Sequence, residues 1–278
     1  MNRFIFFSII CIAVFITAPV YGQFIKWSQP PQFNSQSPEP DCYWGWDEIS
    51  IYEGPQIAGD DWLCEDERPI TGIRWWGSHV GWAEPEPPFP NPMAFHLAIW
   101  TDMPAGEPDP FSHPGTCIWE YVVPYGDVLV VNDGCDYYPG HPIDTCFKYE
   151  TMLPQEAWFY QQPGPTVYWL TISAMYDQPP DMFEWGWKTR EHFWNDAAIR
   201  MFVPLMPIVG SIYIQGEPIY EPDQVPWDLS FELITNSPPP PTPTPVESPT
   251  PTPEESPTPT PSPTWEPDVK WAQPPQFN

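Results

Sequence analysis

Residues 183–188 read Phe-Glu-Trp-Gly-Trp-Lys, with an aromatic side chain at every second position. Successive side chains of a β-strand point to opposite faces, so the aromatic residues of this stretch would share one face. The pattern therefore predicts a strand that buries one of its two sides.

Short strand-like segments recur on both sides of this stretch. Prolines and glycines interrupt the sequence at short intervals, and residues 23–236 show no convincing helical period. Many short strands in one domain of this size predict an all-β fold, a β-sandwich, and we expect a jelly-roll-like topology. A single short helix could form near residues 191–196. The clearest predicted strands are residues 62–64, 70–76, 95–101, 118–123, 127–131, 146–152, 166–174, 183–188, 197–203, 212–214 and 228–234.

The N-terminus has the pattern of a secretory signal peptide. Arg3 precedes an apolar run at residues 4–16, and Pro19 and Gly22 suit a cleaved end. A membrane anchor is the competing interpretation, but the run is shorter than the roughly 20 apolar residues that span a bilayer. We expect cleavage after Gly22 and a protein that is secreted, extracellular or on the cell surface, and not membrane-spanning.

The composition restricts the partners. The 278 residues include 9 Lys+Arg against 37 Asp+Glu, with a net charge of −28. A field of this sign repels nucleic acid, which we exclude as a partner, and it suits divalent cations or neutral ligands such as sugars. Aromatic residues reach 17%, which is enough to build a core and is unlike a disordered acidic chain.

A low-complexity segment follows the globular region. Residues 237–267 consist mainly of Pro, Thr, Ser and Glu. Such a composition has little to bury and predicts a flexible, disordered, extended linker of the kind that separates domains in secreted proteins. The expected organisation is a signal peptide at residues 1–22, a β-sandwich domain at 23–236, the linker at 237–267 and a final segment at 268–278.

The final segment contains an internal repeat. Residues 270–278 repeat residues 26–34, Lys-Trp-Ser-Gln-Pro-Pro-Gln-Phe-Asn, with Ala272 in place of Ser28. One explanation is that a second copy of the domain begins there, as in a tandem series. The other is that the tail is a spare first strand, which inserts into a neighbouring molecule in place of residues 26–34. Both make the domain a module that occurs in series.

The cysteines predict disulfides in an oxidising compartment. Apart from Cys11 in the signal segment, the chain has Cys42, Cys64, Cys117, Cys135 and Cys146. We expect Cys135 to pair with Cys146 across a turn-rich stretch, and Cys42 to pair with Cys64. Cys117 would then be buried and free. A zinc site is the alternative, although no Cys-x-x-Cys spacing occurs.

Several motifs are spread along the predicted domain: Lys-Trp-Ser-Gln-Pro-Pro at 26–31, Asp-Asp-Trp-Leu-Cys at 60–64, Ile-Thr-Gly-Ile-Arg-Trp-Trp-Gly-Ser at 70–78, Phe-His-Leu-Ala-Ile-Trp-Thr-Asp at 95–102, His-Pro-Gly at 113–115, Tyr-Trp-Leu-Thr-Ile at 168–172 and Trp-Gly-Trp at 185–187. As a set, they resemble an uncharacterised family of secreted bacterial β-sandwich domains. The resemblance covers most of residues 26–234. It implies a sandwich fold and repeated, linker-joined copies on secreted proteins, and it brings no activity or catalytic residues.

Seventeen tryptophans are many for this length. Exposed tryptophans on one face of a sandwich would form a platform on which sugar rings stack. The alternative is that most fill the core, which large aromatic side chains dominate. Trp82 and Trp194 lie in turn-like contexts and are the better candidates for ligand binding. The full candidate set is Trp76, Trp82, Trp185, Trp187 and Trp194.

A structural calcium ion is the one cofactor that the acidic residues suggest, since calcium prefers hard oxygen ligands on loops. Asp60 and Asp61 come directly before a predicted strand and are the candidate ligands. No EF-hand spacing occurs, and the abundance of carboxylates makes chance clusters common.

The sequence predicts a non-catalytic extracellular module for adhesion, assembly or carbohydrate binding. Its partners would be a glycan, a cell-surface polymer or copies of itself. The alternative is a secreted glycosidase, which needs two carboxylates on either side of a sugar bond. No pattern selects such a pair, and neither a His-Glu-x-x-His nor a Gly-x-Ser-x-Gly motif is present.

Overall fold

The computed structural model describes residues 22–33, 38–39, 41–106, 108–162, 164–178, 180, 182–220 and 224–236. The linker at 237–267, the tail at 268–278 and all but the last residue of the signal segment lie outside these residues. Within the described ranges, no helix has the length and apolar character needed to cross a membrane.

The strands belong to two sheets. One sheet contains β1 (Phe24–Gln29), β2 (Cys42–Trp44), β3 (Asp47–Ile49), β5 (Gly72–His79), β8 (Leu129–Tyr137), β9 (Asp144–Met152), β11 (Trp185–Glu191), β14 (Trp227–Leu229) and β15 (Phe231–Thr235). The other contains β4 (Ile57–Cys64), β6 (Ala94–Met103), β7 (His113–Pro124), β10 (Thr166–Met175), β12 (Ile199–Val203) and β13 (Gln215–Pro218). Two 3-10 turns, η1 (Tyr125–Asp127) and η2 (Gln155–Ala157), complete the regular structure.

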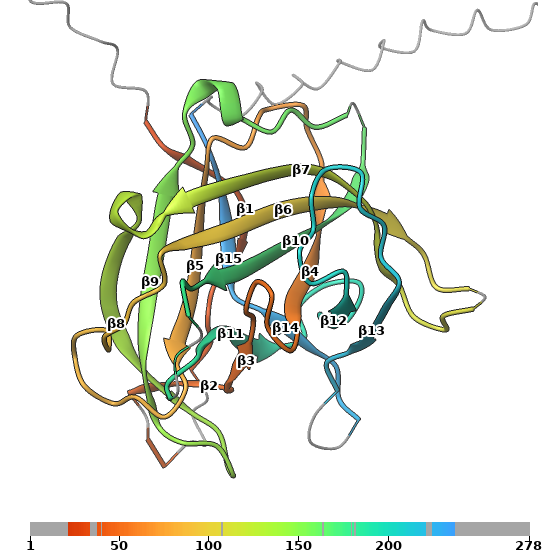
Figure 1. The fold of residues 1–278 in the computed structure, drawn as a ribbon. Helices are drawn as coiled ribbons and strands as arrows, with labels where there is room; N and C mark the ends of the chain where they lie inside the picture. The colour runs from red at the N-terminus through yellow and green to blue at the C-terminus, as the bar shows by residue number, and fades with distance from the viewer. Residues whose placement is uncertain are drawn as a thin grey trace, which may run out of the picture. The chain divides into compact units, whose positions relative to one another are not determined.

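The two sheets pack face to face, which confirms the predicted β-sandwich. The main path of the nine-stranded sheet runs β1-β15-β5-β9-β8-β2, with β11, β14 and β3 paired beside it. The six-stranded sheet runs β13-β12-β4-β10-β6-β7. Figure 1 shows β6, β7 and β10 running across the direction of β5, β9 and β15. The chain passes repeatedly from one sheet to the other, as in jelly-roll-like sandwiches.

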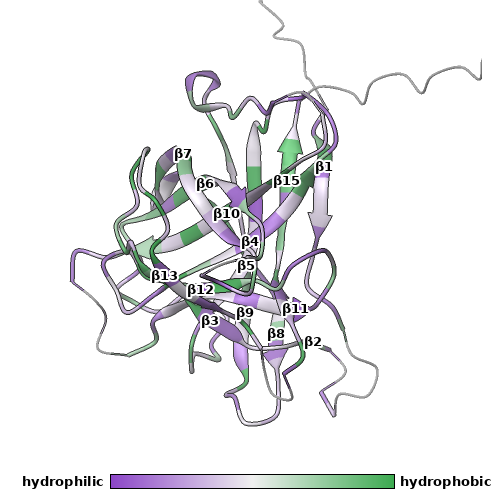
Figure 2. Cartoon of the chain, turned by 90° about the vertical axis from the view of Figure 1, so that its right-hand side faces the viewer, coloured by the Kyte–Doolittle hydropathy of each residue, from purple (hydrophilic) through white to green (hydrophobic). Residues whose placement is uncertain are grey.

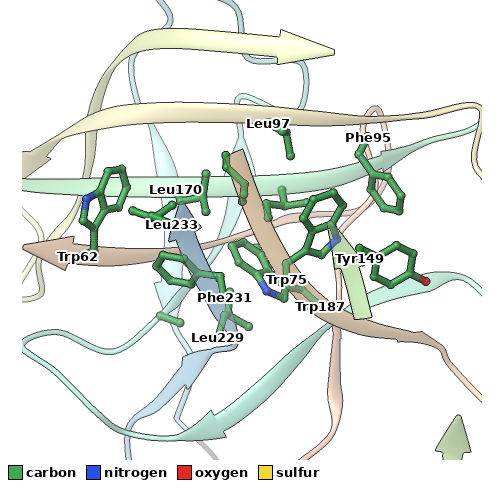
Figure 3. Packing of buried hydrophobic residues seen from close by; sticks show 14 of the residues in the cluster. Trp62, Trp75, Phe95, Leu97, Tyr149, Leu170, Trp187, Leu229, Phe231 and Leu233 are labelled. Atoms are coloured by element: carbon green, nitrogen blue, oxygen red, sulfur yellow. The ribbon is translucent and has the colours of Figure 1, made fainter. Parts of the chain in front are cut away.

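Aromatic side chains fill the space between the sheets. Trp185 and Trp187 are fully buried, as predicted for one face of this strand, but Lys188 and Arg190 are buried too, so both faces of β11 are covered. Trp75 stacks on Tyr149 with ring centroids 5.6 Å apart, and it meets Phe95 of the opposite sheet edge-on at 5.2 Å. Figure 3 shows these rings converging from strands of both sheets.

Some predicted elements differ from the structure. The segment at 191–196 is not a helix, because β11 continues to Glu191 and a loop follows. The Asp228 carboxylate accepts hydrogen bonds from the backbone N–H groups of Phe193 and Trp194 at 2.6 and 3.1 Å. These N–H groups therefore bond to a side chain and not to the backbone carbonyls of a helix. Residues 62–64 are only the end of the longer β4, and 212–214 form no named strand.

Both predicted disulfides are wrong. Cys42 is bonded to Cys135, with a Cα–Cα distance of 4.5 Å. The two face each other because β2 pairs in parallel with β8, whereas Cys146 lies one position out of register with Cys135 on β9. Cys64 lies on the other sheet. Cys117 is buried and free as predicted, and so are Cys64 and Cys146.

Replacing Trp75 with alanine should lower the free energy of unfolding by about 3–5 kcal/mol, because a large buried ring is removed from a close-packed core. Urea denaturation followed by circular dichroism measures this decrease. Tyr160→Ala is the matched control, since Tyr160 is 62% exposed, and it should change the value by no more than about 0.5 kcal/mol. Similar small decreases in both variants would contradict the assigned core.

Candidate functional site

The repeated residues 26–34 include most of β1. This strand lies at the edge of the nine-stranded sheet and pairs antiparallel with β15, Phe24 opposite Thr235 and Gln29 opposite Phe231. In Figure 2, β15 carries hydrophobic residues, whereas β1 beside it is mostly pale or hydrophilic. We call the surface that contacts residues 26–33 the first-strand slot. Besides β15, it is formed by Tyr43, Trp44, Asp60, Asp66, Arg190, Phe193 and Trp194.

A buried lysine begins the interactions in the slot. The side chain of Lys26 is 4% exposed, and its Nζ donates to the Asp66 carbonyl at 2.7 Å and to Asp66 Oδ1 at 2.5 Å. Arg68 Nε donates to the other carboxylate oxygen at 2.9 Å. Burial alone would raise the pKa of Asp66, but the hydrogen bonds from Arg68 and Lys26 outweigh it and hold this pKa below its usual range. Asp66 therefore stays ionised and anchors the strand.

The next interaction lies in the interior of the sandwich. Gln29 is 1% exposed, and its Nε2 donates to Asp60 Oδ2 and to the Leu229 carbonyl, both at 2.7 Å. The backbone N–H of Leu229 donates to the same Asp60 oxygen at 2.7 Å. Burial, followed by the nearby charge of Asp228, raises the pKa of Asp60 well above its usual range. Without Gln29, this buried carboxyl would lack a donor that it cannot replace with water.

An aromatic cluster surrounds Trp27, whose Nε1 donates to Gln29 Oε1 at 2.7 Å. The ring of Trp27 meets Trp194 edge-on with centroids 5.4 Å apart, and Phe193 at 6.0 Å. The guanidinium of Arg190 lies 4.6 Å from the centre of the Phe193 ring. Arg190 also donates to the Pro30 carbonyl at 2.8 Å. The loop after β11 is thus shaped around residues 27–30.

The last part of the segment is held by an aromatic stack and a backbone bond. Phe33 stacks on Tyr43 with centroids 4.5 Å apart, and the backbone N–H of Trp44 donates to the Gln32 carbonyl at 2.7 Å. Ser28 is exposed, and its hydroxyl donates to Glu232 at 2.6 Å. Of these side-chain interactions, only the hydrogen bond from Ser28 could not be made by the repeat, where alanine replaces the serine.

Three of the five candidate tryptophans are buried. Trp185 and Trp187 lie in the core, and Trp76 is 5% exposed with its Nε1 donating to Asp133 at 2.7 Å. These three side chains therefore do not belong to an exposed face of the sandwich.

Trp82 and Trp194 are partly buried and have partners within the domain. Trp82 meets Phe183 edge-on at 5.1 Å and donates its Nε1 to the Glu86 carbonyl at 2.7 Å. Trp194 packs on Trp27 of β1, as described above. The structure therefore does not assemble the five candidates into one sugar-stacking platform.

Asp60 and Asp61 do not form a calcium site in the described ranges. They lie within β4 rather than before a strand, and as adjacent strand residues they point to opposite faces. Asn195 Nδ2 donates to Asp61 Oδ2 at 2.6 Å. Burial raises the pKa of Asp61 to about 9 against the opposing effect of this bond, so the carboxyl is protonated at neutral pH. No cluster of three His, Cys, Asp or Glu side chains suited to a metal ion occurs among the described residues.

Two hollows mark the surface of the sandwich. One, of about 500 Å³, is lined by residues that include Thr101, Asp102 and Gln162. The other, of about 680 Å³, is lined by residues that include Glu86 and Asn132. Each has a single carboxylate among its described lining residues, whereas glycoside hydrolysis uses a pair.

The partners of β1 were not predicted from the sequence. Asp66 and Arg190 lie far from residues 26–33 along the chain, and no local pattern connects them with that segment. The repeat itself was the only signal, since it identified which strand mattered without showing what held it.

The pH dependence of stability should reveal the buried carboxyl of Asp61. Its folded pKa of about 9 lies above the unfolded value of about 3.9. The unfolded state therefore releases this proton first, and the stabilising contribution is lost as the pH rises from about 4 toward 9. Wild type should lose stability relative to Asp61→Asn over this range, measured by urea denaturation at each pH. A constant difference, or stabilisation of wild type alone by calcium, would contradict the assignment.

The contribution of Gln29 is testable against its neighbour. Gln29→Ala should lower the free energy of unfolding by about 1–3 kcal/mol, because it leaves buried acceptors with fewer donors. Ser28→Ala, the change found in the repeat, should cost no more than about 0.5 kcal/mol. Urea denaturation measures the free energy of unfolding of both variants. Equal decreases in the two would show that the buried hydrogen bond of Gln29 does not hold the strand.

Comparison with known proteins identifies a family. Residues 25–234 match the model of a family described as a domain of unknown function, DUF7901. No curated protein and no solved structure matches the chain.

Proposed function

The chain belongs to the DUF7901 family, and we propose that its domain is a non-catalytic extracellular module that joins copies of the protein in series. The observation that carries this proposal is the match between the first-strand slot and the repeat. Lys270, Trp271, Gln273 and Phe277 reproduce the residues whose side chains hold β1 in place.

The exchange would replace residues 26–34 with a segment of nearly the same sequence. In the proposal, residues 270–278 of one molecule occupy the slot of another and displace its residues 26–34. Exchange of near-identical elements is a low-cost route to association, because the incoming segment restores the interactions of the segment that it displaces. The backbone ladder to β15 would provide affinity, and the side chains would fix the register.

The linker suits this exchange. A proline-rich segment of the length of residues 237–267, in extended polyproline form, reaches on the order of 100 Å. Such a reach lets the tail of one molecule find the slot of another without bringing the two domains into contact. The strongly negative net charge of −28 favours a connection by long linkers over direct packing of domain surfaces.

The competing functions have less support. A sugar-binding platform needs coplanar exposed aromatic rings. Trp76, Trp185 and Trp187 are buried, and the ring of Trp194 packs against that of Trp27. A glycosidase needs two facing carboxylates, whereas each of the two hollows offers one among its described residues.

Size-exclusion chromatography with light scattering tests the proposal. The mature protein should form oligomers whose fraction increases with protein concentration, and a form lacking residues 268–278 should stay monomeric. Gln273→Ala should weaken the association, because Gln273 corresponds to the buried Gln29. The matched control is Ala272→Ser, which restores the sequence of the first copy and should associate at least as well as wild type.

Two results would overturn the proposal. If the full and shortened forms are both monomeric at all concentrations, strand exchange does not occur. If the shortened form associates as strongly as the full form, another surface joins the copies. Screening of a glycan array is the next step in the first case.

A further inference from the structure

A buried ion pair lies on the nine-stranded sheet, on strands β8 and β11. Lys188 Nζ is 3.0 Å from Asp136 Oδ1, and the two side chains are 0% and 2% exposed. Lys188 points to the opposite face of β11 from Trp187, since adjacent strand residues alternate. A charge pair this deeply buried has a large desolvation cost, which the mutual attraction offsets only in part. Burial of this pair therefore costs free energy that its mutual attraction does not fully offset.

The strand registers bring two further carboxyls to the pair. Lys188 lies directly opposite Asp47 in the ladder of β3 and β11. Asp136 lies directly opposite Asp144 in the ladder of β8 and β9. The backbone N–H of Gly81 donates to Asp144 Oδ1 at 2.7 Å. One amine and three carboxyls are thus gathered from four strands.

The surroundings fix the amine and the carboxyl against each other. Ser78 Oγ donates to Asp136 Oδ2 at 2.5 Å, which leaves Oδ1 facing Lys188. A Cβ atom at Gly45 would lie 3.2 Å from Lys188 Nζ, so the backbone after β2 passes closely over the amine. The disulfide at Cys135, the residue before Asp136, holds β8 to β2. The two reacting side chains are thus shielded from bulk solvent.

Asp47 has the properties of a proton carrier. It is 7% exposed, and burial, followed by the charge of Asp136, raises its pKa well above the usual range against the opposing charge of Lys188. Asp144 is affected in the same way, with its pKa raised to about 7 mainly by burial. A neutral carboxyl next to the pair can give a proton to one atom and accept a proton from another.

We propose that Lys188 and Asp136 condense to form an intramolecular amide bond, with Asp47 carrying the protons. A proton first passes from the Lys188 ammonium to the Asp136 carboxylate through Asp47, and the neutral amine Nζ then attacks Asp136 Cγ to form a C–N bond. The ammonium loses two protons, one carboxylate oxygen leaves, and together they depart as one water molecule. The sum is ammonium plus carboxylate to amide plus water, with no change in net charge and no oxidant or reductant.

Physical reasons favour this reaction at this place. Holding the two reacting groups in contact gives an effective concentration far above that reached in solution. Condensation also removes two charges from an environment that solvates them poorly, and it leaves an amide, which is neutral. The released water leaves the interior. The bond would join β11 to β8 and is independent of the proposed strand exchange.

Mass spectrometry of the reduced full-length protein tests the proposal. The measured mass should be lower than the sequence mass by one water, once the mature N-terminus is known. Trypsin does not cleave after an acylated lysine, so the peptides 75–148 and 149–190 should remain joined after reduction. Lys188→Arg keeps the charge and should restore the full sequence mass.

Asp47→Asn tests the proton carrier, because it keeps the shape of the side chain and removes the acid. This variant should form the cross-link slowly or not at all while keeping the Cys42–Cys135 disulfide, which reports correct folding. A wild-type mass equal to the sequence mass would overturn the amide bond. A cross-link to peptide 27–74, which contains Asp47, would overturn the assignment of Asp136. If the variants fail to fold, the wild-type peptide map alone decides.

Discussion

The packing of aromatic rings between two crossed sheets is the constraint on which the rest of the structure depends. Trp75, Trp185 and Trp187 occupy inward-facing positions, and Tyr149 and Phe95 close around them. Because every second residue of β5 and β11 is committed to this core, the alternate residues face away from it. The buried lysine and its carboxyl neighbours result from that alternation, with β2 and the glycine after it as their cover.

The sequence predicted those parts of the fold whose pattern is local. Strands such as β5, β9 and β10 show alternation or apolar runs long enough to identify, and the sandwich follows from their number. The strands β2, β3 and β13 are three or four residues long and show no usable period. The disulfide depends on the parallel pairing of β2 with β8 across a separation of 93 residues, which no spacing rule indicates.

The candidate site was predicted in part. The repeat identified residues 26–34, but it could not show that Gln29 reaches a buried carboxyl or that Lys26 reaches Asp66. The tryptophan candidates show the limit of an argument from composition. Their abundance indicated ligand binding, whereas burial of large rings is the more favourable use of such residues in a domain with so much interior to fill.

The pairing of β1 with β15 also determines how the domain responds to force. Phe24 lies opposite Thr235, so the described chain enters and leaves the sandwich side by side. Tension applied at these two points pulls an antiparallel pair apart from its open end, and the hydrogen bonds of the ladder are loaded one after another rather than together. The edge strand would detach first, and the aromatic core would carry no load until it had done so. A string of such domains would lengthen by peeling edge strands while the sandwiches stay folded.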